Sequence, residues 1–226
     1  MNYFTIKSLI ARHKALWVNK IFIISAMVGI LFFIGSLFAN YSAIKYVIRM
    51  EGNATTDILL DNLPVINTDI IFSEGALLFV IFIIFLFIVE PKMIPFTLKS
   101  VALFICIRSI FVIMTHLAPP LGHITVDLDR FRYISSGADL FFSGHTGLPF
   151  LMALLFWENK HLRYFFICCS ITAATAVILG HLHYTIDVFS AFFITYGIYH
   201  IAQRAFPKDR KLFKYGLQTN EIIKEL

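Results

Sequence analysis

Two short stretches of the chain place histidines beside groups that could activate them. In the stretch GHLHYTIDVFSAFF, His183 and Asp187 are four residues apart at the start of an apolar segment. That spacing stacks both side chains on one helix face, where the carboxylate can accept a hydrogen bond from one ring nitrogen. The bond would fix the tautomer and leave the other nitrogen free as a base, a nucleophile or a ligand. The first turn of this helix should also offer unpaired backbone N–H groups, which favour an anion.

The second stretch, DLFFSGHTGLPF, places His145 in the first turn of another apolar segment. Gly144 allows close backbone approach, and the hydroxyls of Ser143 and Thr146 could donate to phosphoryl oxygens. Together with Arg108, which lies within a third apolar segment, these residues could carry out phosphoryl transfer. Such a site needs no metal and no other cofactor.

The elements that must position these residues are membrane spans. The chain has 226 residues, of which 58% are hydrophobic and only 15% are charged, and its mean hydropathy is +0.78. A soluble domain needs more charged surface than that. Several apolar segments approach the length of roughly 20 residues that a bilayer core requires, so we predict an all-α polytopic membrane protein with six transmembrane helices. The expected spans are 17–38, 69–89, 95–118, 141–157, 163–182 and 184–203, of which the fourth is the shortest.

No internal repeat or low-complexity linker interrupts the spans, which indicates one helical domain. Residues 1–16 are expected to form a cytoplasmic amphipathic segment on the membrane surface, since no small-residue cleavage site follows the first apolar run. Residues 17–203 would form the membrane catalytic domain, and residues 204–226 a basic cytoplasmic tail. The cysteines number 3 and lie in apolar segments, which predicts no disulfide framework.

The basic residues indicate how the chain is oriented. An even number of spans puts both termini on one side, and most lysines and arginines fall there. The positive-inside rule therefore places the termini in the cytoplasm and the active site on the exoplasmic side, periplasmic or lumenal. The net charge of +5 is modest and lies mostly outside the spans, so it indicates topology and lipid contact rather than nucleic-acid binding. The exceptions on the exoplasmic side are Lys45, Arg49, Arg130 and Arg132.

The ionisable residues within or at the ends of the spans all fall in the outer half of the membrane under this topology. Such residues are costly in a bilayer and usually functional. Their shared depth predicts one polar cavity that opens outward. These residues are Glu74, Arg108, His145, His181, His183 and Asp187.

Three other interpretations of the polar groups stay open at this point. A membrane histidine is more often an interhelical hydrogen-bond partner than a catalyst, so the groups could be a scaffold with His183 and Asp187 as a clasp. His181 with His183 suggests a metal site, although residues two apart on a helix diverge. Two histidines could also ligate a b-type haem, but His145 and His183 would lie near the membrane surface beside an acid and an arginine, which is a poor haem pocket.

At these motifs the sequence resembles the sphingomyelin synthase family, a branch of the lipid phosphate phosphatase (type 2 phosphatidic acid phosphatase) superfamily. DLFFSGHT is similar to its Ser-Gly-His-Thr motif, and HLHYTIDVFSAFFIT to its His-Tyr-Thr-x-Asp-Val motif. RSIFVIMTHLAPPLG resembles its arginine-led segment. TDILLDNLP followed by SEG resembles the start of its second span. The resemblance covers roughly residues 56 to 203 and places Asp57, Asp61 and Glu74 in addition to the residues above.

The resemblance implies a phospholipid headgroup transferase. His183, oriented by Asp187, would attack the headgroup phosphorus and form a phosphohistidine. His145 would protonate the departing diacylglycerol oxygen and then accept the proton of the incoming hydroxyl. Arg108 and the helix N-termini would neutralise charge on the phosphoryl oxygens. The residues expected to tune this set are Glu74, Asp139 and His181.

The implied donor is phosphatidylcholine or phosphatidylethanolamine, and the implied acceptor is a ceramide-type or diacylglycerol-type lipid alcohol in the outer leaflet. The chain has Gly137-Ala138-Asp139 where the family often has Cys-Gly-Asp, so selectivity for headgroup and acceptor stays undetermined. The sequence also leaves a homo-oligomer open.

The alternative enzyme is a lipid phosphate phosphatase, in which water is the acceptor. The wider superfamily typically has a Ser-Arg pair shortly before its second histidine, where this chain has Ala176 and Val177. A phosphomonoester carries up to two negative charges and a phosphodiester carries one. A site with one buried arginine therefore suits the diester better, which favours headgroup transfer.

Overall fold

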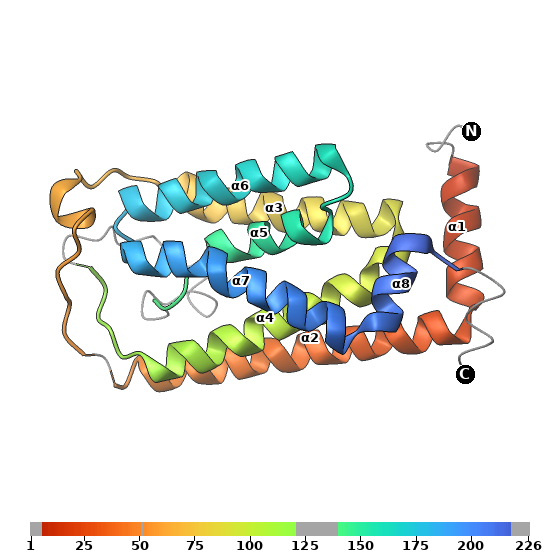
Figure 1. Cartoon of the computed structure of the whole chain (residues 1–226), viewed down its shortest axis with the longest axis horizontal. Helices are drawn as coiled ribbons and strands as arrows, with labels where there is room; N and C mark the ends of the chain where they lie inside the picture. The colour runs from red at the N-terminus through yellow and green to blue at the C-terminus, as the bar shows by residue number, and fades with distance from the viewer. Residues whose placement is uncertain (1–5, 51, 121–139, 218–226) are drawn as a thin grey trace.

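The computed structural model describes residues 6–50, 52–120 and 140–217. Every regular element within these ranges is helical, which confirms the predicted all-α class (Figure 1). The elements are α1 (Ile6–Val18), α2 (Lys20–Val47), η1 (Leu60–Asn62), α3 (Asp69–Val89), η2 (Pro91–Met93), α4 (Ile94–Met114), α5 (Gly144–Leu155), α6 (Lys160–Leu179), α7 (Thr185–Ala205) and α8 (Pro207–Tyr215).

Five helices in the described part of the chain are long and apolar enough to cross a membrane, namely α2, α3, η2 with α4, α6 and α7. The first of them differs from the predicted span 17–38. It begins only at Lys20, because the Asn19 side chain accepts a hydrogen bond from the Phe22 N–H and so caps the helix there. It then continues to Val47, beyond the apolar stretch.

The sixth apolar helix, α5, has 12 residues, fewer than the roughly 20 that span a bilayer core. It is shorter than the predicted span 141–157 because Ser143 caps it, so the residues before Gly144 are not helical. In Figure 1, α5 lies inside the bundle with α6 and α7 beside it. Most of its side chains are buried, and Leu151, Met152 and Ala153 are at most 1% exposed. α5 therefore packs against protein rather than lipid.

Gly147 lies where α5 comes close to α4 and α7. A Cβ atom at this position would lie 2.8 Å from the Phe104 ring and 2.9 Å from the Thr195 hydroxyl oxygen. Neighbouring helices approach this closely in membrane proteins where small residues line the interface. The missing side chain at position 147 thus sets the distance of α5 from α4 and α7.

Gly147→Ala is expected to destabilise the protein by about 1–3 kcal/mol, because the buried Phe104 ring cannot move away from the added methyl group. Thermal unfolding in detergent would measure the loss. Gly197→Ala is the matched control, since nothing lies within 4 Å of a Cβ at that position of α7. Equal melting temperatures for the two variants would contradict the close packing.

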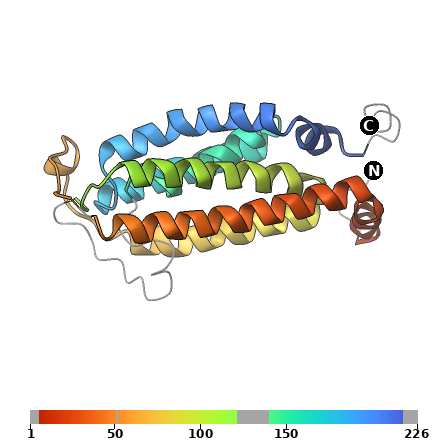
Figure 2. The ribbon, with the colours of Figure 1, turned by 90° about the horizontal axis from the view of Figure 1, so that it is seen from below.

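The two ends of the bundle differ. The segment 52–68 loops across the end where α7 begins, whereas α1 and α8 lie at the opposite end, and α1 runs across the direction of α2 (Figures 1 and 2). Beside α8, the Lys99 ammonium donates to Asp209 Oδ2 at 2.7 Å and to Ser25 Oγ at 2.9 Å. Ser25 also donates to the second oxygen of Asp209. This ion pair connects α2, α4 and α8, and both charged residues are buried.

Candidate functional site

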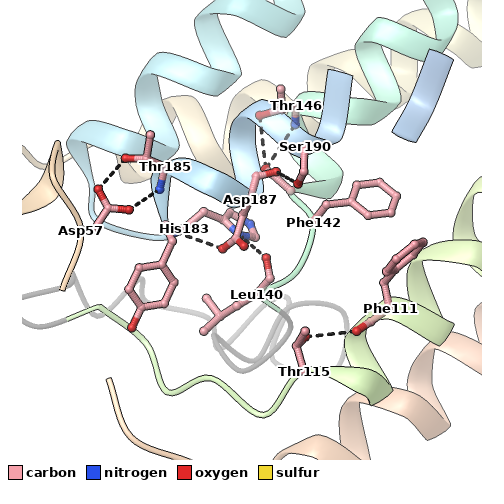
Figure 3. A network of polar contacts seen from close by, with 12 residues as sticks. Asp57, Phe111, Thr115, Leu140, Phe142, Thr146, His183, Thr185, Asp187 and Ser190 are labelled. Atoms are coloured by element: carbon pink, nitrogen blue, oxygen red, sulfur yellow. Dashed lines mark hydrogen bonds and ion pairs between the residues drawn. The ribbon is translucent and has the colours of Figure 1, made fainter. Parts of the chain in front are cut away.

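His183 lies just before α7 with its ring nitrogen Nδ1 between two acceptors (Figure 3). The backbone oxygen of Leu140 lies 2.8 Å from Nδ1, and Oδ2 of Asp187 lies 3.5 Å from it. Because a carbonyl oxygen only accepts, the bond to Leu140 requires the proton on Nδ1. In the neutral imidazole, Nε2 is then unprotonated and carries a lone pair. The structure thus brings His183 and Asp187 together as predicted, but the shorter contact of the ring is with a backbone carbonyl.

Asp187 also organises the start of α7. Its Oδ2 accepts from the Tyr184 N–H at 3.0 Å, which closes a capping box. Its backbone oxygen accepts from the Ser143 N–H at 3.1 Å and from the Ser190 hydroxyl at 3.2 Å. The buried Oδ1 makes no hydrogen bond within the described residues. One residue therefore fixes both the histidine loop and the segment that leads into α5.

The first turn of α7 is not open to an anion, contrary to the expectation. Oδ2 of Asp57 accepts from the Thr185 N–H at 2.7 Å, and Oδ1 accepts from the Thr185 hydroxyl at 2.6 Å. With the Tyr184 N–H bound by Asp187, protein carboxylates occupy two of the N–H groups that a phosphate would use. Any phosphate is therefore better placed at α5.

The same hydrogen bonds shift the acidity of Asp57. Burial raises its pKa and is the largest single influence, but hydrogen bonds from the Thr185 side chain and backbone and from the Leu60 and Leu59 N–H groups together outweigh it. The net result is a pKa below the ordinary value of 3.8. A lowered carboxyl pKa contributes stability above the unfolded value, and this contribution is lost as the pH falls through the folded value.

Asp57→Asn is expected to lower stability at pH 7 by about 1 kcal/mol, because the amide lacks the negative charge that favours the positive end of α7 and has only one acceptor oxygen. The difference from wild type should shrink as the pH falls below 3.8 toward the lowered pKa of the folded state, where the wild-type carboxylate takes up a proton. Melting temperatures of both proteins measured from pH 7 to pH 3 would check this. A difference that does not change with pH would mean that the charge of Asp57 is not involved.

The N-terminus of α5 is built from the predicted hydroxyl pair. Ser143 Oγ accepts from the Thr146 N–H at 3.4 Å and from the Thr146 hydroxyl at 3.2 Å. Both side chains are fully buried. The Thr146 backbone oxygen accepts from the Ser170 hydroxyl of α6 at 2.8 Å. Through these bonds Ser143 and Thr146 hold the start of α5 in place. Their donation to a phosphoryl oxygen stays a prediction.

Arg108 crosses from α4 to this helix end. Its Nε donates to the Phe142 backbone oxygen at 2.9 Å. A Cβ atom at Gly144 would lie 3.2 Å from Nε and 3.5 Å from Cζ, so the guanidinium lies directly against the glycine. The guanidinium of Arg108 therefore lies beside the positive N-terminal end of α5. Arg108 is only 7% exposed. A cation beside a helix N-terminus attracts an anion.

His145 is half-buried in the first turn of α5. Its ring stacks on the Phe72 ring of α3 with a centroid distance of 3.9 Å and an interplanar angle of 29°. Arg108 and Phe72 thus tie this helix end to two different helices. Phe72 was not among the predicted site residues, because nothing distinguishes it in sequence from the other phenylalanines of α3.

His181 occupies an unusual position at the end of α6. Its N–H donates to the Ile178 oxygen and the Leu182 N–H donates to the Val177 oxygen, which together form a Schellman motif after the capping residue Gly180. The position that normally carries glycine in this motif is His181, with a φ of 51°. Its ring is 4% exposed, and neither ring nitrogen has a hydrogen-bond partner within the described residues. A strained backbone and an unpaired buried imidazole are together typical of functional positions.

We expect His181→Gly to be about 1 kcal/mol more stable than His181→Ala, because only glycine adopts this backbone without cost. Both substitutions should lower lipid turnover, by on the order of tenfold if the imidazole tunes its neighbours. Thermal unfolding and a turnover assay on both variants would separate the two effects. Wild-type turnover in the glycine variant would show that the His181 side chain has no part in the reaction.

Two predicted residues differ from the others in what the structure shows of them. Glu74 is exposed on α3, two residues beyond Phe72. Asp139 lies outside the described residues. The gathered set is His183, Asp187, Arg108, Ser143, Gly144 and Thr146, with His145 and His181 at the same end of the bundle.

The architecture and the site describe a polytopic helical membrane protein with histidine, carboxylate and arginine groups at one end. Comparison with known families agrees with this description. A model of the PAP2 superfamily, C-terminal part, matches residues 137–204, a range that includes both histidine motifs. No curated protein and no solved structure matches the chain. The match supports the lipid phosphate phosphatase/PAP2 superfamily, and hence an enzyme with phosphatase- or phosphotransferase-type lipid chemistry.

Proposed function

We propose that the protein transfers a phosphocholine or phosphoethanolamine headgroup from a glycerophospholipid to a ceramide-type lipid alcohol. The observation that carries this proposal is the placement of His183. Its Nδ1 is hydrogen-bonded to the Leu140 oxygen, with the Asp187 carboxylate beside it, so Nε2 keeps its lone pair. This resembles the arrangement that activates a nucleophile in covalent catalysis.

In the first step, Nε2 of His183 attacks phosphorus, and the bond from phosphorus to the diacylglycerol oxygen breaks. His145 donates a proton to that oxygen, so diacylglycerol leaves as an alcohol. The imidazole becomes positively charged as it forms the phosphohistidine. Asp187 and the Leu140 carbonyl both face the Nδ1 proton and stabilise that charge.

In the second step, His145 accepts the proton of the acceptor hydroxyl, whose oxygen attacks the same phosphorus. The bond from phosphorus to Nε2 of His183 then breaks, and both histidines return to their starting state. This reversal explains why two histidines are needed, one as nucleophile and one as proton carrier.

The phosphoryl oxygens would lie at the N-terminus of α5 beside Arg108. The guanidinium and the helix end provide positive charge there, whereas carboxylates occupy the first turn of α7. One buried arginine matches the single negative charge of a phosphodiester. This charge balance supports an intact phospholipid as donor rather than a phosphomonoester.

Hydrolysis is the second candidate, and the match to the PAP2 superfamily is as compatible with hydrolysis as with transfer. Water would replace the lipid alcohol in the second step, while the residues and the first step stay the same. The two functions thus differ only in the acceptor. We place both termini in the cytoplasm, which puts either reaction in the outer leaflet.

The test uses purified protein in vesicles that contain headgroup-labelled phosphatidylcholine or phosphatidylethanolamine together with ceramide. Labelled sphingolipid is the expected product, and the donor that yields it identifies the headgroup. Release of only water-soluble label would establish hydrolysis in place of transfer. Turnover of neither lipid would overturn the proposed substrates.

A further inference from the structure

A groove lies between α1 and the end of α3. α1 lies at the end of the bundle opposite the start of α7 (Figure 1). The volume of the groove is about 510 Å³ and its walls are almost wholly apolar. The lining residues are Leu9, Ile10, His13, Lys14, Trp17 and Ile88.

Two polar contacts hold α1 in place to form this groove. Arg12 makes an ion pair with Glu90, directly after α3. Nε2 of His13 lies 2.7 Å from the Ile88 backbone oxygen. His13 and Ile88 both line the groove, so its walls are set by the docking of α1 onto the end of α3.

The groove continues the lipid-facing surface of α3. Only 6% of the apolar window of α3 is buried, the lowest share among the five candidate spans of the described residues. Ile81, Ile84 and Ile88 follow one another at helical spacing and are 52%, 52% and 56% exposed. A hydrocarbon chain that lies along these isoleucines in the bilayer leads directly into the groove.

A cation lies at the rim of the same groove. Ile10, Lys14 and Trp17 follow the spacing of one helix face, so the ammonium of Lys14 stands between two exposed apolar side chains. Lys14 is exposed, and no ion pair of Lys14 occurs within the described part of the chain. Lys7, one turn before Ile10, adds a second exposed cation.

From this combination we infer that the groove binds one phospholipid with a net negative headgroup, taken from the leaflet opposite the catalytic site. An acyl chain lies along Ile88 and packs against Ile10 and Trp17. The headgroup phosphate meets the ammonium of Lys14. An anionic lipid gains from both features, whereas a zwitterionic lipid carries a cation of its own that offsets the attraction.

The test uses Trp17, which lines the groove, as the reporter. The chain has 2 tryptophans, so Trp157→Phe leaves Trp17 as the single tryptophan. The full-length protein is reconstituted in phosphatidylcholine vesicles that contain increasing fractions of phosphatidylglycerol brominated on its acyl chains. Brominated phosphatidylcholine at the same fractions is the reference. Bromine quenches a tryptophan only on near contact, so quenching reports which lipid occupies the groove.

We expect brominated phosphatidylglycerol to half-quench Trp17 at a roughly fivefold lower fraction than brominated phosphatidylcholine. Lys14→Gln should abolish this preference and Lys14→Arg should retain it. Lys208→Gln removes an equally exposed cation of α8 and should leave the preference unchanged. Equal quenching by both lipids in the wild-type background would overturn the inference. An equal loss in the Lys14→Gln and Lys208→Gln variants would also overturn it, because diffuse surface charge would then be sufficient.

Discussion

His183→Gln is expected to reduce lipid turnover by at least about 10³-fold, while the protein remains folded. The glutamine amide can still donate a hydrogen bond toward the Leu140 oxygen, so the loop before α7 keeps a comparable contact. It has no nitrogen lone pair that could attack phosphorus. Both transfer and hydrolysis should therefore stop, because both proceed through the same covalent step.

The covalent intermediate gives this prediction a direct measurement. Wild-type protein incubated with a phospholipid that carries labelled phosphate should retain label that survives alkali and is lost in acid, as a phosphorus–nitrogen bond is. The His183→Gln protein should retain none. His200→Gln is a matched control, since His200 lies near the other end of α7, in edge-to-face contact with Tyr196 and Tyr199. Label on the His183→Gln protein would assign the nucleophile to another residue.

Asp209→Leu is expected to cost about 3–5 kcal/mol of stability, the largest loss that we predict from a single substitution. The substitution leaves the Lys99 ammonium, whose side chain is 9% exposed, without its carboxylate. A buried charge without a partner is far more costly than the pair itself. Chemical or thermal unfolding in detergent would measure the loss.

Two further variants separate a buried charge from lost packing. Lys99→Met combined with Asp209→Leu should recover most of the stability, because no charge is then left in the apolar interior. Glu158→Gln breaks the exposed ion pair with Lys214 and should cost less than about 1 kcal/mol. A double variant as unstable as Asp209→Leu would show that the pair stabilises the protein in itself.

The helices could be predicted well because long apolar runs leave few alternatives in a membrane protein. The pairing of His183 with Asp187 could likewise be predicted, since the two residues are only four positions apart, although His183 lies before the first residue of α7. The hydrogen bond from His183 to the Leu140 carbonyl could not be predicted, because every residue has a carbonyl and the sequence does not distinguish the one that meets the ring. Contacts between residues far apart in the sequence, such as Asp57 with Thr185, could not be predicted either. Their partners become neighbours only after the bundle has assembled.

The ion pair between Lys99 and Asp209 illustrates the same limit. The sequence placed both residues near the cytoplasmic surface, where charges are usually solvated. Burial of the pair follows from the packing of α8 against α4, which depends on the apolar residues Leu212 and Phe213 rather than on the charges. A tail that looks basic and soluble in sequence thus has one face inside the protein.

The shortness of α5 has a consequence for how the chain enters the membrane during synthesis. A helix of 12 residues does not reach across the hydrocarbon core, and it carries the polar end that holds His145. Such a segment gains little from leaving the insertion machinery alone. It is joined to the full-length helix α6 by only a tight turn at residues 156–159 and packs along it. We therefore expect α5 and α6 to pass into the bilayer together as one hairpin, so that the end of α5 that holds His145 takes its final place only when α6 inserts with it.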